Sequence, residues 1–86
     1  MEKTNIYGFE VEYEKSSESA EKALKFFEEI GESGTKAFFD EARRDLVNHT
    51  CHFKVHDHNS ISNREYHLTL IHKDDGSYHL RKTTGY

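Results

Sequence analysis

The sequence predicts a small α+β domain with the element order β-α-α-β-β-β. Apolar and polar residues alternate in one segment near the start of the chain and in three segments of its second half, and two segments between them repeat apolar residues at helical spacing. The length of 86 residues allows one modest core and no second module. We therefore expect residues 1–86 to form a single domain, a four-stranded, mainly antiparallel sheet with two helices packed on one face.

The first strand is expected at residues 6–14, where apolar residues occupy every second position. Two helices are expected next, at residues 17–30 and 35–47, because apolar residues recur there every three to four positions. Gly31 stands where a C′ glycine would end the first helix, and the short connection indicates an antiparallel helical hairpin. The apolar stripe of the second helix is expected to extend to Leu46 and Val47.

Three further strands are expected at residues 50–57, 64–73 and 77–82, since each alternates apolar and polar side chains. The sequence leaves the order of the strands open. The inner, helix-covered face of the sheet is expected to carry Tyr7, Phe9, Val11, Phe53, Val55, Leu68, Leu70, Tyr78 and Leu80.

The turn between the last two strands decides how they pair. A three-residue loop with Gly76 in the left-handed conformation pairs Leu70 with Leu80 and His72 with Tyr78. A two-residue loop would instead mix apolar and polar residues on one face. We therefore expect the three-residue loop.

The helix-free face of the last three strands is expected to be rich in histidines and cations. All seven histidines of the chain lie in residues 46–86. A one-sided antiparallel sheet ordinarily has a polar outer face, but that rule does not explain the enrichment in histidine. The residues expected on this face are His52, Lys54, His56, His58, His67, Thr69, Ile71, Lys73, His79 and Arg81.

We interpret the chain as a small non-catalytic protein-binding domain, either an inhibitor, an adaptor or a regulatory protein, such as a phage-type antagonist of host machinery. Ile71 is expected to be exposed at the centre of the helix-free face, inside a polar and cationic rim typical of a small interface. A chain this short leaves little room for a ligand pocket, and no cofactor is expected. The predicted protein-binding residues are Ile71, His67, Lys73, His79, Arg81, His52, Lys54 and His56.

An acidic surface is the alternative binding site. Residues 1–45 carry twelve acidic residues against seven basic ones. On this hypothesis Glu10, Glu12 and Glu14 would imitate nucleic-acid phosphates and dock on a nucleic-acid-binding protein.

A histidine-rich metal site is a weaker alternative. His56 and His58 lie two residues apart on one strand, so their Cα atoms would be about 6.5 Å apart on the same face, and His67 could supply a third ligand. The sequence has one cysteine and neither an HExxH nor a CxxC motif. No metal is therefore part of the preferred interpretation.

Other functions are disfavoured. The net charge of −4 opposes binding of nucleic acid to the sheet, since phosphate neutralisation dominates such affinity. Cys51 and His52 would point to opposite faces of a strand, so they do not form a nucleophile and base, and no enzyme is expected. No apolar run has the ~18 residues of a membrane span. Without a targeting segment, a cytoplasmic location is expected, and the oligomeric state stays open.

Overall fold

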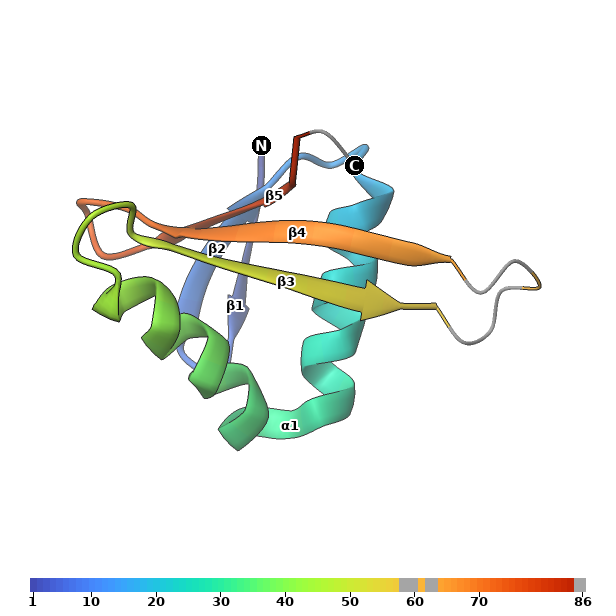
Figure 1. Cartoon of the computed structure of the whole chain (residues 1–86), viewed down its shortest axis with the longest axis horizontal. Helices are drawn as coiled ribbons and strands as arrows, with labels where there is room; N and C mark the ends of the chain where they lie inside the picture. Colours follow the sequence, from blue (N-terminus) through green and yellow to red (C-terminus); the bar gives the residue numbers. More distant parts are fainter. Residues whose placement is uncertain (58–60, 62–63, 85–86) are drawn as a thin grey trace.

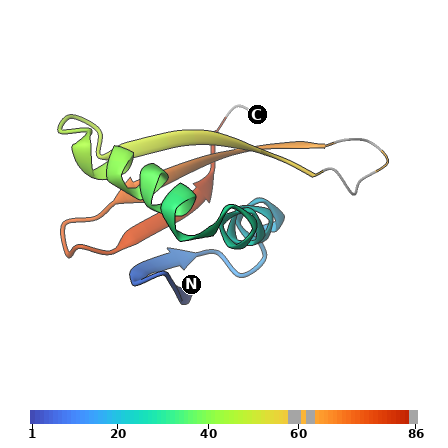
Figure 2. The ribbon, with the colours of Figure 1, turned by 90° about the horizontal axis from the view of Figure 1, so that it is seen from below.

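The structure, a computed structural model, describes residues 1–57, 61 and 64–84. In that part of the chain, one helix packs on one face of a five-stranded sheet with the order β1-β2-β5-β4-β3 (Figures 1 and 2). The elements are β1 (Glu2–Ile6), β2 (Phe9–Tyr13), α1 (Glu18–Arg44), β3 (Thr50–His56), β4 (Glu65–His72) and β5 (Tyr78–Lys82).

The predicted four-stranded, mainly antiparallel sheet with two helices is wrong. The sheet has a fifth strand, and it is mixed, because β2 and β5 run parallel while the other neighbouring pairs are antiparallel. The predicted helices are halves of α1, which bends where they were expected to be separate.

The expected first strand at residues 6–14 is divided by a turn. Tyr7 and Gly8 have φ angles of 50° and 91°, the left-handed values that a two-residue hairpin loop requires. The side chain of Asn5 stabilises this turn, since its Oδ1 accepts a hydrogen bond from the Gly8 N–H at 3.0 Å. Tyr7 is consequently 43% exposed in the turn, and its predicted place on the inner face is wrong.

Ser17 is the N-cap of helix α1, and its Oγ accepts a hydrogen bond from the Ala20 N–H at 3.2 Å. Its backbone leaves the helical region at Gly31, where φ is 80° and ψ is −177°. The two halves therefore meet at an angle (Figure 1). Across this kink the buried Thr35 hydroxyl donates a hydrogen bond to the Phe27 carbonyl oxygen at 3.0 Å, which gives that carbonyl a partner where the helix is interrupted.

The C-terminal end of α1 comes earlier than predicted. The Asp45 carboxylate accepts hydrogen bonds from the N–H groups of Val47 and Asn48, and this Asx-type turn replaces the next helical turn. These bonds also hold the pKa of Asp45 below its usual range, with the bond from Asn48 contributing most. Leu46 and Val47 are 83% and 84% exposed, so the prediction that they belong to the apolar stripe is wrong.

The core lies between α1 and the inner face of the sheet. Aromatic rings from the helix dominate it: Phe39 stacks on Phe9 with a centroid distance of 4.3 Å, and Phe27 lies 5.5 Å from Phe53. The predicted inner-face residues are confirmed apart from Tyr7, with Phe9 partly buried. The buried apolar residues are Val11, Ala20, Ala23, Phe27, Phe39, Ala42, Cys51, Phe53, Val55, Tyr66, Leu68, Leu70, Tyr78 and Leu80.

The predicted register of the last hairpin is confirmed. Leu70 pairs with Leu80 and His72 with Tyr78. The Lys73 N–H donates to the Ser77 carbonyl at 2.8 Å. Gly76 adopts the expected left-handed conformation, with φ at 88°.

Replacing Gly76 with valine should destabilise the domain by about 1 kcal/mol or more, because an L side chain is penalised at this positive φ. A Cβ at this position meets no atom within 4 Å, so the cost comes from the backbone and not from a clash. Urea denaturation checks the result, with Thr84→Val as the control because Thr84 is exposed. Equal losses in the two variants would contradict this role of the turn.

Candidate binding surface on the helix-free face of the sheet

The strand register brings most of the predicted binding residues onto one surface. We call it the outer face, the side of β3, β4 and β5 that is opposite α1, together with Glu12 of β2 and the segment that follows β5. One row across the strands contains Thr50, Ile71, His79 and Glu12, and the next contains His52, Thr69 and Arg81. Two further rows pair Lys54 with His67 and His56 with Glu65. His58, which was expected on the same face, lies outside the described residues.

Ile71 lies on the outer face as predicted, but its side chain is half-buried and not fully exposed. Thr50 and His79 flank it in the same row, on the two neighbouring strands. The apolar contact that Ile71 offers to a partner is therefore smaller than the sequence alone suggested.

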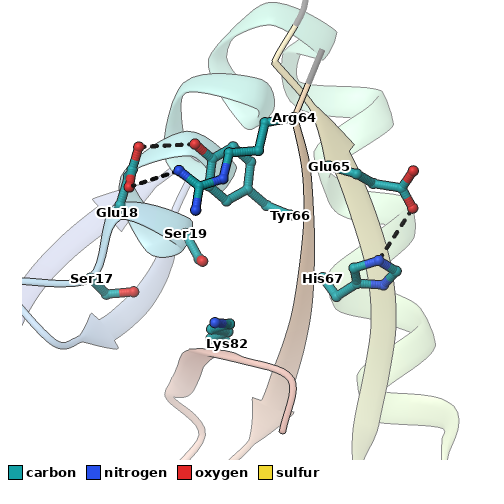
Figure 3. Close-up of a pocket in the computed structure, with 8 residues that line it drawn as sticks. All are labelled: Ser17, Glu18, Ser19, Arg64, Glu65, Tyr66, His67 and Lys82. Carbon is teal, nitrogen blue, oxygen red and sulfur yellow. Dashed lines mark hydrogen bonds and ion pairs between the residues drawn. The ribbon is translucent and has the colours of Figure 1, made fainter. Parts of the chain in front are cut away.

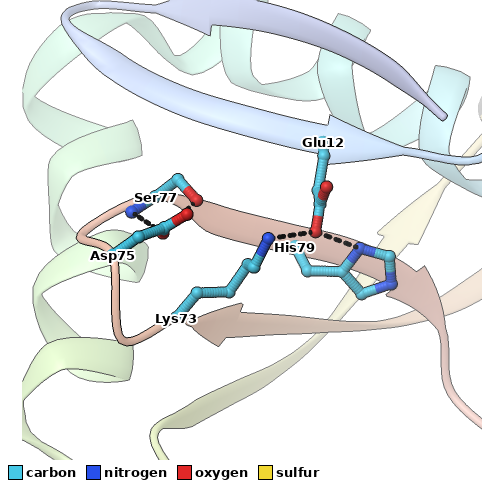
Figure 4. Close-up of polar contacts among 5 residues, drawn as sticks. All are labelled: Glu12, Lys73, Asp75, Ser77 and His79. Carbon is cyan, nitrogen blue, oxygen red and sulfur yellow. Dashed lines mark hydrogen bonds and ion pairs between the residues drawn. The ribbon is translucent and has the colours of Figure 1, made fainter.

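A carboxylate organises one end of the outer face (Figure 4). Lys73 Nζ donates a hydrogen bond to Glu12 Oε1 at 2.7 Å, and His79 Nδ1 is 3.6 Å from the same oxygen. The bond from Lys73 is the largest cause of the lowered pKa of Glu12, and Glu12 in turn raises the pKa of Lys73. His79 Nδ1 is buried and has no hydrogen-bond partner among the described residues.

The contact between Lys73 and Glu12 affects the alternative hypothesis of an acidic binding surface. Glu12 of β2 is paired with Lys73, which directly follows β4, and the Glu12 side chain is only 20% exposed. Glu10 and Glu14 are exposed, as that hypothesis requires. The three glutamates therefore do not form a uniformly available row of negative charge.

A second carboxylate organises the opposite end of the outer face. Glu65 contacts His56 Nε2 at 2.9 Å through Oε2, and His67 Nε2 at 3.2 Å and Lys54 Nζ at 3.5 Å through Oε1. The hydrogen bond with His56 is the largest cause of the lowered pKa of Glu65. Glu65 was not among the residues predicted for this face, although the alternation of residues 64–73 places it on the same face as His67.

The middle of the outer face is a chain of hydrogen bonds. His52 Nδ1 is 2.9 Å from Thr69 Oγ1, which is 2.8 Å from Thr83 Oγ1. Thr69 is fully buried even though it points away from α1. The Thr83 N–H donates to the His67 carbonyl at 2.9 Å, so the chain after β5 continues to follow β4. The hydrogen bonds around Thr69 hold the middle of the outer face in place. His52 and Arg81, on either side of Thr69, are exposed.

Cys51 and His52 point to opposite faces, as expected from their adjacent positions in β3. Cys51 is buried on the inner face, where its Sγ donates a hydrogen bond to Glu41 Oε2 at 2.7 Å. Burial, followed by the Glu41 carboxylate, raises the pKa of this thiol to about 12. The thiol is therefore protonated at neutral pH, a state in which it is a poor nucleophile.

Within residues 1–57, 61 and 64–84, no three His, Cys, Asp or Glu side chains are arranged to hold a metal ion. Two of the three ligands predicted for the alternative metal site, His56 and His67, both contact Glu65. The third, His58, lies outside the described residues.

In the described part of the chain, no helix has both the length and the apolar character needed to cross a bilayer.

Comparisons with protein-family models, with curated proteins and with solved structures find no match to this chain.

Proposed function

We propose that this chain is a protein-binding domain whose outer face binds an acidic surface of a partner protein. The observation that carries the proposal is the distribution of charge. His52 and Arg81 are exposed in one row, and the Lys54 side chain is 60% exposed in the next.

The acids of the outer face are already paired with cations or imidazoles. Glu12 contacts Lys73 at one end, and Glu65 contacts Lys54 and two histidines at the other. Among the described residues, the hydrogen bonds of Arg81, which lies between them, are long, at 3.4 and 3.5 Å, and go to the segment that follows it. An acidic partner would therefore meet a positive potential at the centre, and complementary potentials favour both encounter and orientation.

Histidines make this potential depend on pH. An ordinary imidazole titrates near pH 6.5, at about the middle of the range from 7.5 to 6. Each imidazole of the outer face that gains a proton as the pH falls adds positive charge, so we expect binding to an acidic surface to become tighter. A partner that binds through the exposed Glu10 and Glu14 would not gain affinity in this way.

Reversing two charges on the outer face tests the proposal. The doubly substituted Lys54→Glu/Arg81→Glu chain and the wild-type chain are used as bait in cell lysate, and the captured proteins are compared by mass spectrometry. Lys36→Glu is the matched control, because Lys36 is exposed on α1, away from the outer face. We expect a partner that the control captures and the double variant loses, with an affinity for the purified partner reduced by more than tenfold, or about 1.4 kcal/mol.

The melting temperature of the double variant should stay close to that of the wild type, since exposed charges contribute little to stability. Unchanged binding by this variant, together with loss of binding in Glu10→Lys/Glu14→Lys, would contradict the proposal and favour the acidic surface.

A further inference from the structure

Strand β3 is an open edge of the sheet. It pairs with β4 on one side, and no described strand lies on its other side (Figure 1). Its seven residues pair with β4 without a bulge, whereas β1, at the opposite edge, has five residues. A long and regular edge of this kind presents backbone groups that another extended segment can bond.

The register shows which backbone groups of β3 face outward. The Asp57 N–H donates to the Arg64 carbonyl at 2.9 Å, one step beyond the last pair of the β3–β4 ladder. In an antiparallel ladder such hydrogen-bonded positions recur at every second residue, so Phe53 is bonded to β4. The N–H and C=O groups of His52 and Lys54 therefore point away from β4, and no hydrogen bond links them to another described residue.

A hollow of about 240 Å³ lies on the helix side of this edge, between the first half of α1 and the end of β3. Phe26 and Val55 line it, and the Phe26 side chain is only partly buried, so an apolar side chain could pack there. Small-molecule sites occupy roughly 300–1,000 Å³. A pocket at the start of α1 reaches that size, at about 430 Å³, so the expectation that so short a chain leaves little room for a pocket is not met (Figure 3). The hollow beside β3 is smaller and suits a single side chain.

The outer side of the same edge is cationic. His52 and Lys54 are both exposed there. Lys54 Nζ is 3.5 Å from Glu65 Oε1, but that oxygen is also 3.2 Å from His67 Nε2, toward which the Glu65 carboxylate points in Figure 3. The ammonium has three donors and shares this one carboxylate, so it can also bind an acid from a neighbouring strand. Opposite charges on adjacent strands stabilise their pairing.

The charge of the edge opposes a second copy of this chain as the occupant. Two β3 strands paired antiparallel about their centres would place Lys54 opposite Lys54 or opposite His52. Like charges in such positions destabilise a strand pair, and edge lysines commonly prevent self-association. The complementary occupant is therefore an acidic strand.

From these observations we propose that β3 binds an extended segment of a partner protein in which acidic and apolar residues alternate. The segment pairs antiparallel with β3, the slightly more stable arrangement, and becomes a sixth strand of the sheet. Its backbone bonds the N–H and C=O groups of His52 and Lys54, its acidic side chains lie on the outer face, and its apolar side chains lie on the side of Phe26. This mode of binding rests on the proposed function, since it specifies how an acidic partner meets the outer face.

Titration of the ¹⁵N-labelled chain with the synthetic peptide TEVEVEVT, its ends blocked, tests strand addition by nuclear magnetic resonance. We expect saturable binding. With the free peptide at ten times its dissociation constant, the amide hydrogen exchange of His52 and Lys54 should slow about tenfold. The exchange of Phe53, whose N–H already bonds to β4, should change much less.

Two further peptides separate strand addition from attraction between charges. A peptide with lysine in place of each glutamate should bind more than tenfold more weakly, because its charge repels the outer face. A peptide that keeps the glutamates but carries an N-methyl group on each glutamate amide should also bind more than tenfold more weakly. These amides are the ones that would donate to β3, and methylation removes their hydrogen bonds.

Two substitutions at one position test the edge from the side of the chain. Lys54→Thr and Lys54→Pro both remove the charge, but only proline also removes the N–H. Proline is tolerated in edge strands where the N–H faces solvent. We expect Lys54→Pro to bind the acidic peptide at least tenfold more weakly than Lys54→Thr. If Lys54→Pro fails to fold, the N-methylated peptide decides the question with the unchanged chain.

Equal binding of the N-methylated and unmodified acidic peptides would overturn strand addition and leave the proposed function standing, because attraction between charges would then explain the binding. Absence of saturable binding by the acidic peptide, or equal binding of the lysine peptide, would overturn the acidic segment as the occupant. Protection of His52 and Lys54 that rises with the concentration of the chain alone would also overturn it, since a second copy would then cover the edge.

Discussion

Replacing Phe27 with alanine will destabilise the domain by about 3–5 kcal/mol. Phe27 is fully buried, and its ring lies 5.5 Å from both Phe39 and Phe53, so it joins the two halves of α1 to the sheet. Truncation would leave a cavity among rings that cannot collapse to fill it. Urea denaturation measures the loss.

Leu46→Ala is the matched apolar control, because Leu46 is 83% exposed and its truncation should change stability by no more than about 0.5 kcal/mol. If Phe27→Ala does not fold, Phe27→Leu keeps most of the buried volume and should show a smaller loss. A stability equal to that of the wild type in either Phe27 variant would contradict this arrangement of the core.

Replacing Gly31 with alanine will destabilise the domain by about 1–3 kcal/mol, since a φ of 80° with a ψ of −177° is a conformation essentially restricted to glycine. Nothing lies within 4 Å of a Cβ placed there, so the cost again comes from the backbone. The substitution opposes the kink that allows both halves of α1 to cover the sheet. Thermal and urea denaturation measure the effect.

Gly34→Ala is the control within the same helix. Gly34 lies past the kink in helical backbone, where alanine is favoured by about 1 kcal/mol over glycine. A Cβ there would meet the Ile30 side chain at 3.2 Å, so part of that gain is offset. A loss in Gly34→Ala as large as that in Gly31→Ala would show that the kink has no special requirement for glycine.

The second half of the sheet could be predicted from the sequence because two local signals agreed. Alternation assigned Leu68, Leu70 and Leu80 to the inner face, and the Gly76 turn allowed one register that kept them there. The structure has both features. The parallel pairing of β2 with β5 could not be predicted in this way, since it joins strands that are far apart in the chain.

Strand β1 was missed because its sequence, EKTNI, contains a single apolar residue. An edge strand with this composition has no alternation of apolar and polar residues to detect. The Tyr7–Gly8 turn was hidden for a related reason, because Tyr7 continues the alternation of Phe9 and Val11 although its backbone is in the turn.

The candidate site was predictable only as a set of outward-pointing residues. Alternation placed His52, Lys54 and Arg81 on a common face, but it could not show that the Thr69 hydroxyl between them is buried. Side-chain pairs such as Glu12 with Lys73 depend on the parallel contact between β2 and β5 and so required the tertiary structure.

Mapping the bound partner onto the chain tests the outer face most directly. The measurement is the change of backbone amide signals in the ¹⁵N-labelled domain when the purified partner is added. We expect the largest changes at His52, Lys54 and Arg81, whose side chains point outward from β3 and β5, with little change along the exposed side of α1. The largest changes at Lys36 and the neighbouring exposed residues of α1, or at Glu10 and Glu14, would contradict binding through the outer face.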